Sequence, residues 1–355
     1  MSANTKIEWC DHSWSPWRGC TKVSAGCAHC YAETLSKRNP KVLGEWGRGK
    51  PRVMAKNWSD PVKWNVRGFI CRECGKAQHA DRCCSGHCSG KTTPQTVFPS
   101  LCDWLDEEVP TGWLARFLQL IHDTPHLTWL LLTKRPENFE SRIDAAYEHS
   151  HGEGWQSLWT QGEAPANVWV GTSVENQEYA DRRIPALLKI PAVGRFLSLE
   201  PLLGPVRVWD EGFIPADEDG PERVGYMVGK DDGRSPLRVT PSAAMAGINW
   251  LIIGGESGHG ARPCNLDWIR SLIAQGKAAE VRTFVKQLGA RPLVNWPMAG
   301  NDGSAGVVEV GKTVAFTDCS GAAAGTVKQF SHPKGGNPDE WPADVRVRQY
   351  PVGLR

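Results

Sequence analysis

The sequence predicts a parallel α/β fold, arranged as a full or partial barrel of strands and helices. Several short apolar runs end in small or polar residues, and segments with helical periodicity separate them. Near-continuous apolar runs of this length are typical of strands buried on both faces, as in parallel sheets. A chain of 355 residues has room for a barrel with insertions, because such folds occupy about 250 residues or more.

The predicted strands and helices alternate along the chain. The strands lie, in order, within residues 95–104, 127–138, 167–176, 194–204, 249–258 and 281–289. A helix is predicted within VPTGWLARFLQLIHD, residues 109–123, because its apolar residues recur at helical spacing. A second is predicted within QEYADRRIPALLKI, residues 177–190. Chemistry in such folds lies at the carboxyl ends of the strands, where polar residues follow several of the apolar runs.

Three segments interrupt this pattern and define the domain organisation. Residues 1–293 are predicted to form the barrel, with a cysteine-rich insertion at 66–92 and a surface insertion, rich in Gly, Pro, Asp and Glu, at 207–247. Residues 294–355 are predicted to form a small C-terminal β appendage, which contains the strand-like GVVEVGKTVAF, and a closing segment.

Composition narrows the class of protein. The formal charge of +2 is too mild to indicate a nucleic-acid partner by itself. The sequence has no apolar run of membrane-spanning length and no signal-peptide pattern at its start, which predicts a soluble, intracellular protein without a membrane partner. Its 12 cysteines are clustered, which favours metal binding or catalysis over a disulfide scaffold. The 17 tryptophans suit either base stacking or core packing.

The first cysteine cluster is GCTKVSAGCAHC, with Cys20, Cys27 and Cys30. The CxxC spacing lets two thiolates face one metal, and Gly26 permits a tight turn before it. Three thiolates can hold three irons of a 4Fe-4S cluster and leave the fourth iron open for S-adenosylmethionine, which such an iron can cleave to a 5′-deoxyadenosyl radical. The alternatives are a zinc site completed by a nearby His or Cys side chain, or buried thiols.

The second cysteine cluster is CRECGKAQHADRCCSGHC, within the insertion at 66–92. Cys71, Cys74, Cys84 and Cys88 are the predicted ligands of a structural zinc ion, although Cys83 could replace Cys84, since one of these two thiols is spare. An auxiliary iron-sulfur cluster is the alternative. Basic residues around this cluster could contact phosphate, or form a charged, solvated surface.

Motifs along nearly the whole chain carry a family resemblance. They are TKIEWCDHSWSPWRGCTKVSAGCAHCYAE, LLTKRPEN, VWVGTSVENQEYADRRIPALL, RFLSLEPLLGPV, WLIIGGESGHGARP, FVKQLG and KGGNPDEWPADVRVRQYP. This set resembles the three-Cys-motif family of phages and bacteria, which is similar to radical S-adenosylmethionine enzymes. The resemblance implies an incomplete parallel barrel of about six strands, of radical S-adenosylmethionine type, with Cys20, Cys27 and Cys30 as cluster ligands. The usual CxxxCxxC spacing differs here, because six residues separate Cys20 from Cys27.

Candidate cofactor and catalytic residues lie at the predicted strand ends. Cofactor contacts are assigned to Ser173, Asn176, Gly254, Gly255, Glu256 and Ser257. Ser173 and Asn176 could bond ribose hydroxyls, although they could equally cap the following helix. The Gly-Gly-Glu stretch follows a later strand than it does in radical S-adenosylmethionine enzymes, so we interpret it as a loop facing the site. The candidate catalytic residues are Glu175, Glu200 and Lys134.

These features together predict an enzyme. The favoured function is a radical S-adenosylmethionine enzyme that modifies, rearranges or repairs a nucleic-acid base, with phage DNA pyrimidines as the leading substrate. Its expected partners are DNA or a nucleotide and an electron-donor protein, in the cytoplasm of a bacterial or phage-infected cell. The alternatives are a zinc-containing nucleic-acid-binding protein without redox chemistry, and a hydrolase that uses a strand-end glutamate as general base.

Overall fold

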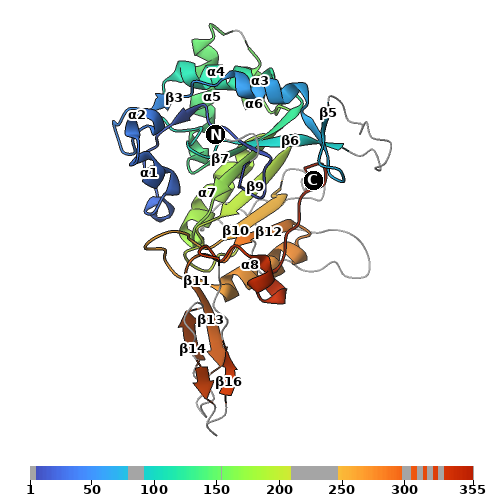
Figure 1. Cartoon of the computed structure of the whole chain (residues 1–355). Helices are drawn as coiled ribbons and strands as arrows, with labels where there is room; N and C mark the ends of the chain where they lie inside the picture. The colour runs from blue at the N-terminus through green and yellow to red at the C-terminus, as the bar shows by residue number, and fades with distance from the viewer. Residues whose placement is uncertain are drawn as a thin grey trace, which may run out of the picture.

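A curled parallel sheet forms the centre of the molecule (Figure 1). The computed structural model describes residues 5–78, 92–152, 154–208, 247–297, 305–309, 315–317, 323–326 and 332–354. Within these ranges seven parallel strands build a half-barrel in the order β1-β6-β7-β8-β9-β10-β12. They are β1 (His12–Ser13), β6 (Thr92–Phe98), β7 (Leu127–Thr133), β8 (Val168–Ser173), β9 (Gly194–Leu199), β10 (Trp250–Gly254) and β12 (Arg282–Gln287). The predicted parallel α/β partial barrel is confirmed. The expected number of strands was about six, and the short β1 was not among the apolar runs.

Helices cover the convex face of the sheet. The longer ones are α4 (Thr111–His122), α5 (Phe139–His149), α7 (Gln177–Lys189) and α8 (Leu266–Ala278). Both helices predicted from periodicity are confirmed, and in α4 the side chains of Leu114, Phe117, Leu118 and Ile121 are buried at the expected spacing. Shorter helices are α1 (Tyr31–Ser36), α2 (Pro40–Leu43), α3 (Ser59–Val66), α6 (Gln156–Thr160), η1 (Ala25–Cys27), η2 (Pro136–Asn138), η4 (Pro338–Glu340) and η5 (Ala343–Val345).

The sheet separates two apolar cores. In β7, Trp129 and Leu131 belong to the core under the helices, whereas Leu130 between them belongs to the concave-face core. This alternation follows from the pleat, which points successive side chains to opposite faces. The concave-face core contains Trp9, Cys10, Phe98, Leu130, Phe196, Trp250, Ile252, Phe284 and Leu354. Segments near both ends of the chain therefore cover part of the concave face.

The tryptophans serve mainly to fill these cores. Among the described residues, the buried ones are Trp9, Trp14, Trp17, Trp104, Trp129, Trp159, Trp250 and Trp341. Trp104 and Trp159 stack with ring centroids 5.8 Å apart, beneath the helices. Of the two interpretations of the tryptophan content, these buried rings support core packing.

The closing segment packs against the barrel. The Val285 backbone N–H donates to the Val347 carbonyl at 2.8 Å, and the Gln349 N–H donates to the Thr283 carbonyl at 2.8 Å, along the edge of β12. The Tyr350 hydroxyl then donates to the Glu8 carbonyl at 2.9 Å. Residues 345–354 therefore join the open edge of the half-barrel to the N-terminal segment.

The C-terminal appendage projects from the barrel as β strands (Figure 1). In a three-stranded sheet, the central β13 (Pro292–Pro297) pairs with β11 (Cys264–Asn265) on one side and with β14 (Ala305–Glu309) on the other. A two-stranded sheet pairs β15 (Ala315–Thr317) with β16 (Ala323–Thr326). The first strand of this projection that follows the half-barrel, β13, begins at Pro292.

The cysteine-rich insertion begins with a hairpin. β4 (Phe69–Cys71) pairs antiparallel with β5 (Ala77–Gln78) and with the first residues of β6. A further small sheet joins β2 (Trp17–Arg18) to β3 (Val53–Met54). Residues 79–91, which include Cys83, Cys84 and Cys88, and residues 209–246 of the predicted surface insertion lie outside the described residues.

Candidate functional site

The segment that carries Cys20, Cys27 and Cys30, residues 20–31 and here called the cysteine loop, lies at the carboxyl end of the half-barrel. Ala25–Cys27 form the short helix η1, which places Cys27 one turn before Cys30. The three thiols are free; Cys27 is buried, and Cys20 and Cys30 keep some exposed surface. Side chains that follow β7, β8 and β10 hold the loop in place.

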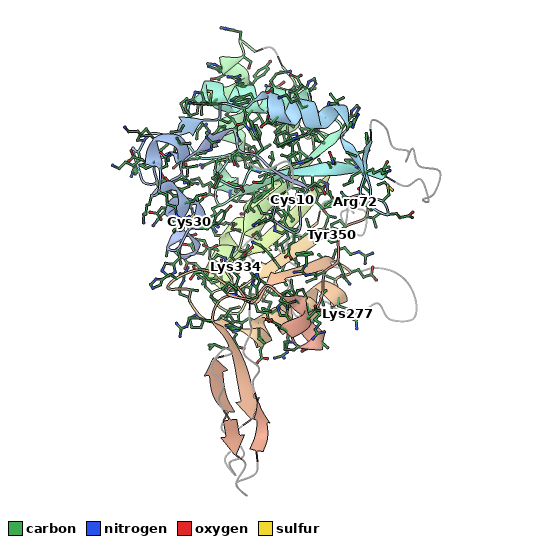
Figure 2. The ribbon with its side chains drawn as sticks, viewed as in Figure 1. Cys10, Cys30, Arg72, Lys277, Lys334 and Tyr350 are labelled. Carbon is green, nitrogen blue, oxygen red and sulfur yellow. The ribbon has the colours of Figure 1, made fainter. Side chains whose placement is uncertain are left out.

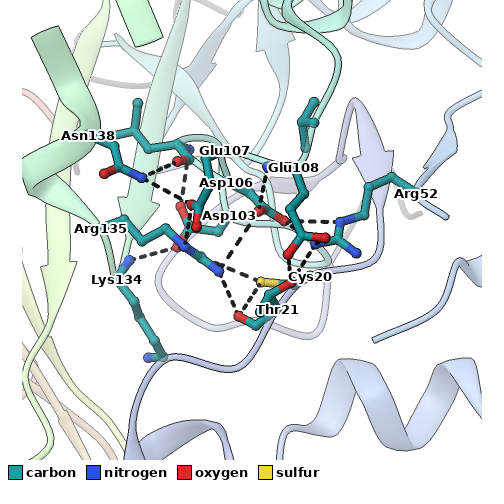
Figure 3. A network of polar contacts seen from close by, with 12 residues as sticks. Cys20, Thr21, Arg52, Asp103, Asp106, Glu107, Glu108, Lys134, Arg135 and Asn138 are labelled. Carbon is teal, nitrogen blue, oxygen red and sulfur yellow. Dashed lines mark hydrogen bonds and ion pairs between the residues drawn. The ribbon is translucent and has the colours of Figure 1, made fainter. Parts of the chain in front are cut away.

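Arg135, which follows β7, holds the start of the cysteine loop (Figure 3). Its Nη1 lies 3.8 Å from Cys20 Sγ and 2.8 Å from Asp103 Oδ2, and its Nη2 donates to the Thr21 carbonyl at 2.7 Å. Asp103 in turn accepts from the Lys134 backbone N–H at 2.8 Å and from Thr133 Oγ1 at 2.6 Å. The guanidinium is therefore fixed between the strand ends and the loop.

A second arginine extends this network. Arg52 Nη2 donates to Thr21 Oγ1 at 2.7 Å and lies 2.9 Å from Asp106 Oδ2, with both charged groups buried. The Thr21 hydroxyl donates to Glu108 Oε1 at 2.6 Å, and this bond is the largest cause that lowers the pKa of Glu108. Burial raises the pKa of Asp106, although Arg135 and Arg52 oppose that effect. Charged groups of both signs thus surround Thr21, the loop residue next to Cys20.

Glu175, which follows β8, binds the middle of the cysteine loop. The Gly26 backbone N–H donates to its Oε1 at 3.2 Å, and Arg183 Nη1 from α7 lies 2.9 Å from its Oε2. Glu175 and Arg183 are almost fully buried. A Cβ atom on Gly26 would lie 3.0 Å from Glu175 Cδ, so glycine allows this close approach. Because both carboxylate oxygens of Glu175 are engaged, this geometry favours a role in holding the loop.

Glu256, which follows β10, binds the end of the cysteine loop. Its Oε2 lies 2.9 Å from His29 Nδ1 and accepts from Arg262 Nε at 2.9 Å, and its Oε1 accepts from Arg262 Nη2 at 2.6 Å. Arg262 also donates to the Ala25 carbonyl at 2.9 Å. Burial works against ionisation of Glu256, but the hydrogen bonds from Arg262 and His29 prevail and lower its pKa to about 2.

Glu200 and Lys286 form a polar cluster on the concave face beyond the aromatic core. Lys286 Nζ lies 2.7 Å from Glu200 Oε1 and 2.9 Å from Oε2, and Gln287 Nε2 donates to Oε1 at 3.0 Å. A Cβ atom on Gly254 of the intervening β10 would lie 3.2 Å from Glu200 Cγ, so a side chain there would crowd the pair. Glu200 and Lys286 are both partly exposed, which leaves this carboxylate accessible to a bound molecule.

Lys134 points away from the acidic network around Arg135 (Figure 3). Its ammonium is close enough to Cys30 to lower the pKa of that thiol, although burial dominates and the net shift is upward. In the described part of the chain no carboxylate lies within ion-pair distance of this ammonium. The Lys134 side chain therefore faces the cysteine loop with its charge available to an anionic group.

The remaining predicted cofactor residues lie in different surroundings. The Asn176 side chain accepts from the Tyr179 backbone N–H at 3.2 Å and so caps α7, which is the alternative to a role in cofactor binding. Gly255 lies against backbone, since a Cβ there would be 2.3 Å from the Leu288 carbonyl oxygen. Ser173 is buried at the end of β8, Gly254 lies beside Glu200, and Ser257 is half-buried in the loop after β10.

Burial raises the pKa of the Cys20 and Cys30 thiols. Although Cys20 is partly exposed, desolvation and the nearby Asp103 raise its pKa to about 12, and Arg135 opposes the rise. Among the described residues, no three His, Cys, Asp or Glu side chains converge closely enough to hold a single metal ion. The three thiolates of a 4Fe-4S cluster bind three different irons, so they need not converge on one point.

The second cysteine cluster lies on another side of the half-barrel. Figure 2 shows Cys30 and Arg72, the residue after Cys71, on opposite sides of the sheet. Cys71 and Cys74 flank a turn in which the Gly75 N–H donates to the Cys71 carbonyl at 2.8 Å and Gly75 has a φ of 69°. Arg72 forms a bidentate pair with Asp11, at 2.8 and 3.1 Å, so this cation already has an anionic partner. The other predicted zinc ligands, Cys84 and Cys88, lie outside the described residues.

Several residues of the site were missed in the sequence. Arg52 and Arg262 bind the cysteine loop through contacts that span 31 and 237 residues, and Arg183 binds the anchor Glu175 from 8 residues further along the chain; no local motif marks them. Lys286 and Gln287 offered a signal, because they end a predicted strand. Their pairing with Glu200 required the strand order β9-β10-β12.

The fold and the site together define an α/β half-barrel protein with a thiol-bearing loop bound at its strand ends. Residues 4–323 match the family model described as "Protein of unknown function (DUF5131)", and the chain therefore belongs to the DUF5131 family. No curated protein and no solved structure gave a significant match. In the described ranges no helix combines the length and the apolar character that crossing a membrane requires.

Proposed function

We propose that this protein is a radical S-adenosylmethionine enzyme whose 4Fe-4S cluster is held by Cys20, Cys27 and Cys30. The observation that carries the proposal is the position of the cysteine loop, which is bound to the strand ends by Arg135, Glu175 and Glu256. Parallel barrels carry their chemistry at this end of the strands. Because these three side chains anchor the loop, its three thiols can lie at a defined place at the strand ends.

The donor set suits the proposed cluster. Thiolates are the ligands of iron-sulfur clusters, and three of them leave one iron open to a small molecule. When bound, the cluster supplies one electron to the sulfonium of S-adenosylmethionine, which yields methionine and a 5′-deoxyadenosyl radical. Because burial raises the pKa of the Cys20 and Cys30 thiols, assembly of the cluster would release protons.

The side chains at the strand ends have distinct roles under this proposal. Glu175 and Glu256 hold the loop, since their carboxylates are engaged by it and by buried or half-buried arginines. Lys134 supplies an ammonium that can bind a carboxylate or phosphate next to Cys30. Glu200 is the best placed general base of the three predicted catalytic residues, because its carboxylate is partly exposed while Lys286 and Gln287 fix its position.

The proposed substrate is a nucleic-acid base, with a pyrimidine of phage DNA favoured. The cation at Lys134 supports an anionic substrate, and a base reaches a site at the end of a barrel only when it is flipped out or single-stranded. The buried tryptophans give no support to base stacking. Binding of single-stranded DNA that weakens steeply with salt is therefore expected, and a lack of binding even at low salt would remove DNA as the substrate.

The second candidate is a zinc-containing nucleic-acid-binding protein without redox chemistry. The turn between Cys71 and Cys74 favours it, because a CxxC hairpin with a glycine in the left-handed region is the usual shape of a zinc knuckle. Under this alternative both cysteine clusters would be structural. Metal content separates the two candidates.

The test is anaerobic reconstitution with iron and sulfide, followed by counts of iron, sulfide and zinc per chain. Wild type is expected to bind about four irons and to show an electron paramagnetic resonance signal, after reduction, that changes when S-adenosylmethionine is added. Cys27→Ala is expected to lose this cluster. Cys264→Ala is the matched control, because Cys264 is a free, buried thiol outside the loop. Zinc without iron in the wild type would reject the radical enzyme in favour of the binding protein.

A further inference from the structure

Arg135 makes a contact with Cys20 that a purely structural anchor does not need. Nη1 of its guanidinium lies 3.8 Å from Cys20 Sγ, within the range for a hydrogen bond to sulfur. Asp103 at 2.8 Å and the Thr21 carbonyl at 2.7 Å hold the same guanidinium, and its side chain is only 4% exposed. A positive charge is thus fixed against one of the three sulfurs.

We propose that Arg135 is a positioning residue that raises the reduction potential of the cluster bound by Cys20, and that the carboxylate of Asp103 moderates this effect. The inference rests on the proposed function, because it concerns the cluster that Cys20, Cys27 and Cys30 would hold. This role of Arg135 is distinct from ligation of the cluster, and the family resemblance does not imply it.

The physical reason is the charge added on reduction. One electron enters the site from a low-potential one-electron donor, which is dithionite in the test below, and no bond forms or breaks. Reduction therefore makes the cluster and its thiolates more negative by one charge. N–H donors and cations close to the sulfurs stabilise this state and raise the potential. Arginine is suited to the role because it stays protonated in proteins.

The carboxylates around Arg135 are expected to lower the reduction potential, which is the opposite of the effect of the guanidinium. Asp103 lies 2.8 Å from Arg135 Nη1, and Asp106 lies 3.9 Å from Nη2. Asp106 is shared with Arg52 at 2.9 Å, whereas among the described residues Asp103 is paired with Arg135 alone. Removal of the Arg135 charge is therefore expected to lower the potential, and removal of the Asp103 charge to raise it.

The test compares wild type with Arg135→Gln, Arg135→Lys and Asp103→Asn, each reconstituted anaerobically. Iron and sulfide are counted first, and the midpoint potential is then measured by titration with dithionite, followed by electron paramagnetic resonance. Arg195→Gln is the matched control, because Arg195 is also a buried arginine but lies at the start of β9, at the strand end away from the loop, where its Nε donates to the Ile190 carbonyl at 3.2 Å. Its potential is expected to equal that of wild type.

Opposite shifts distinguish the electrostatic role from a general loosening of the loop. The expected result is a lower potential in Arg135→Gln, a smaller decrease in Arg135→Lys and a higher potential in Asp103→Asn. If Arg135→Gln binds no iron, a decrease in Arg135→Lys together with an increase in Asp103→Asn still supports the proposal. Shifts of the same sign in the Arg135 and Asp103 variants, or no shift in either, would overturn it while the proposed function stands. A wild type that binds no iron would overturn both.

Discussion

Glu175 accepts a hydrogen bond from the Gly26 backbone N–H at 3.2 Å, across 149 residues of sequence. The bond joins the end of a central strand to the middle of the cysteine loop. The second oxygen of the carboxylate pairs with buried Arg183 at 2.9 Å, so one side chain links the loop to both β8 and α7. The arrangement makes the loop part of the packed barrel end.

Replacement of Glu175 by Ala is expected to destabilise the protein by about 3–5 kcal/mol, because it leaves the buried Arg183 without its partner. Urea denaturation of the apo protein measures the change. Glu137→Ala is the control, since the Arg182–Glu137 pair is comparably short, at 2.8 Å against 2.9 Å, but exposed, and its loss should cost about 1 kcal/mol or less. Equal losses in the two variants would show that burial does not distinguish these pairs.

Gly26→Ala is expected to displace the cysteine loop, because the new Cβ would meet Glu175 at 3.0 Å. We expect a destabilisation of about 1–3 kcal/mol and a reduced uptake of iron. Gly204→Ala is the control, since its Cβ would have Asn176 Cβ at 3.8 Å, an ordinary contact. A double variant with Glu175→Ala should be less destabilised than the sum of the single variants. Strict additivity would contradict the proposed clash.

Glu256 is expected to make stability depend on pH in the acid range. Its pKa of about 2 in the folded chain lies below the ordinary value of 4.5, so its contribution is full above pH 4.5 and is lost as pH falls from 4.5 toward 2. The loss should be about 2 kcal/mol between pH 6 and pH 3. Urea denaturation at several pH values should show a shallower dependence in Glu256→Gln. Identical curves for the two proteins would rule out this carboxylate as the cause.

The two cysteine clusters are expected to bind their metals independently. Cys71→Ser should remove zinc from the chain and leave the iron content unchanged, because Arg72, the neighbour of Cys71, and Cys30 lie on opposite sides of the sheet in Figure 2. Cys27→Ala should remove iron and leave zinc. Elemental analysis of both variants after anaerobic reconstitution measures the two contents. Loss of both metals in either single variant would show that the clusters depend on one another.

The sequence by itself determined the elements of the fold. Apolar runs such as 127–138 and 249–258 predicted β7 and β10, and the periodicity of 109–123 predicted α4, because burial on two faces or on one helical stripe leaves a local pattern. The short β1 left no such pattern. It consists of His12 and Ser13 and exists through its pairing with β6.

The sequence also identified the cysteine loop and most of the polar strand ends, but it could not assign their roles. Glu175 and Glu200 look alike as glutamates that follow apolar runs. In the folded chain Glu175 binds Arg183 and Gly26, whereas Glu200 stays partly exposed beside Lys286. Only tertiary structure decides such a difference, because the partners of a carboxylate at a strand end come from segments that are distant in sequence. Their distances depend on the order and curl of the strands.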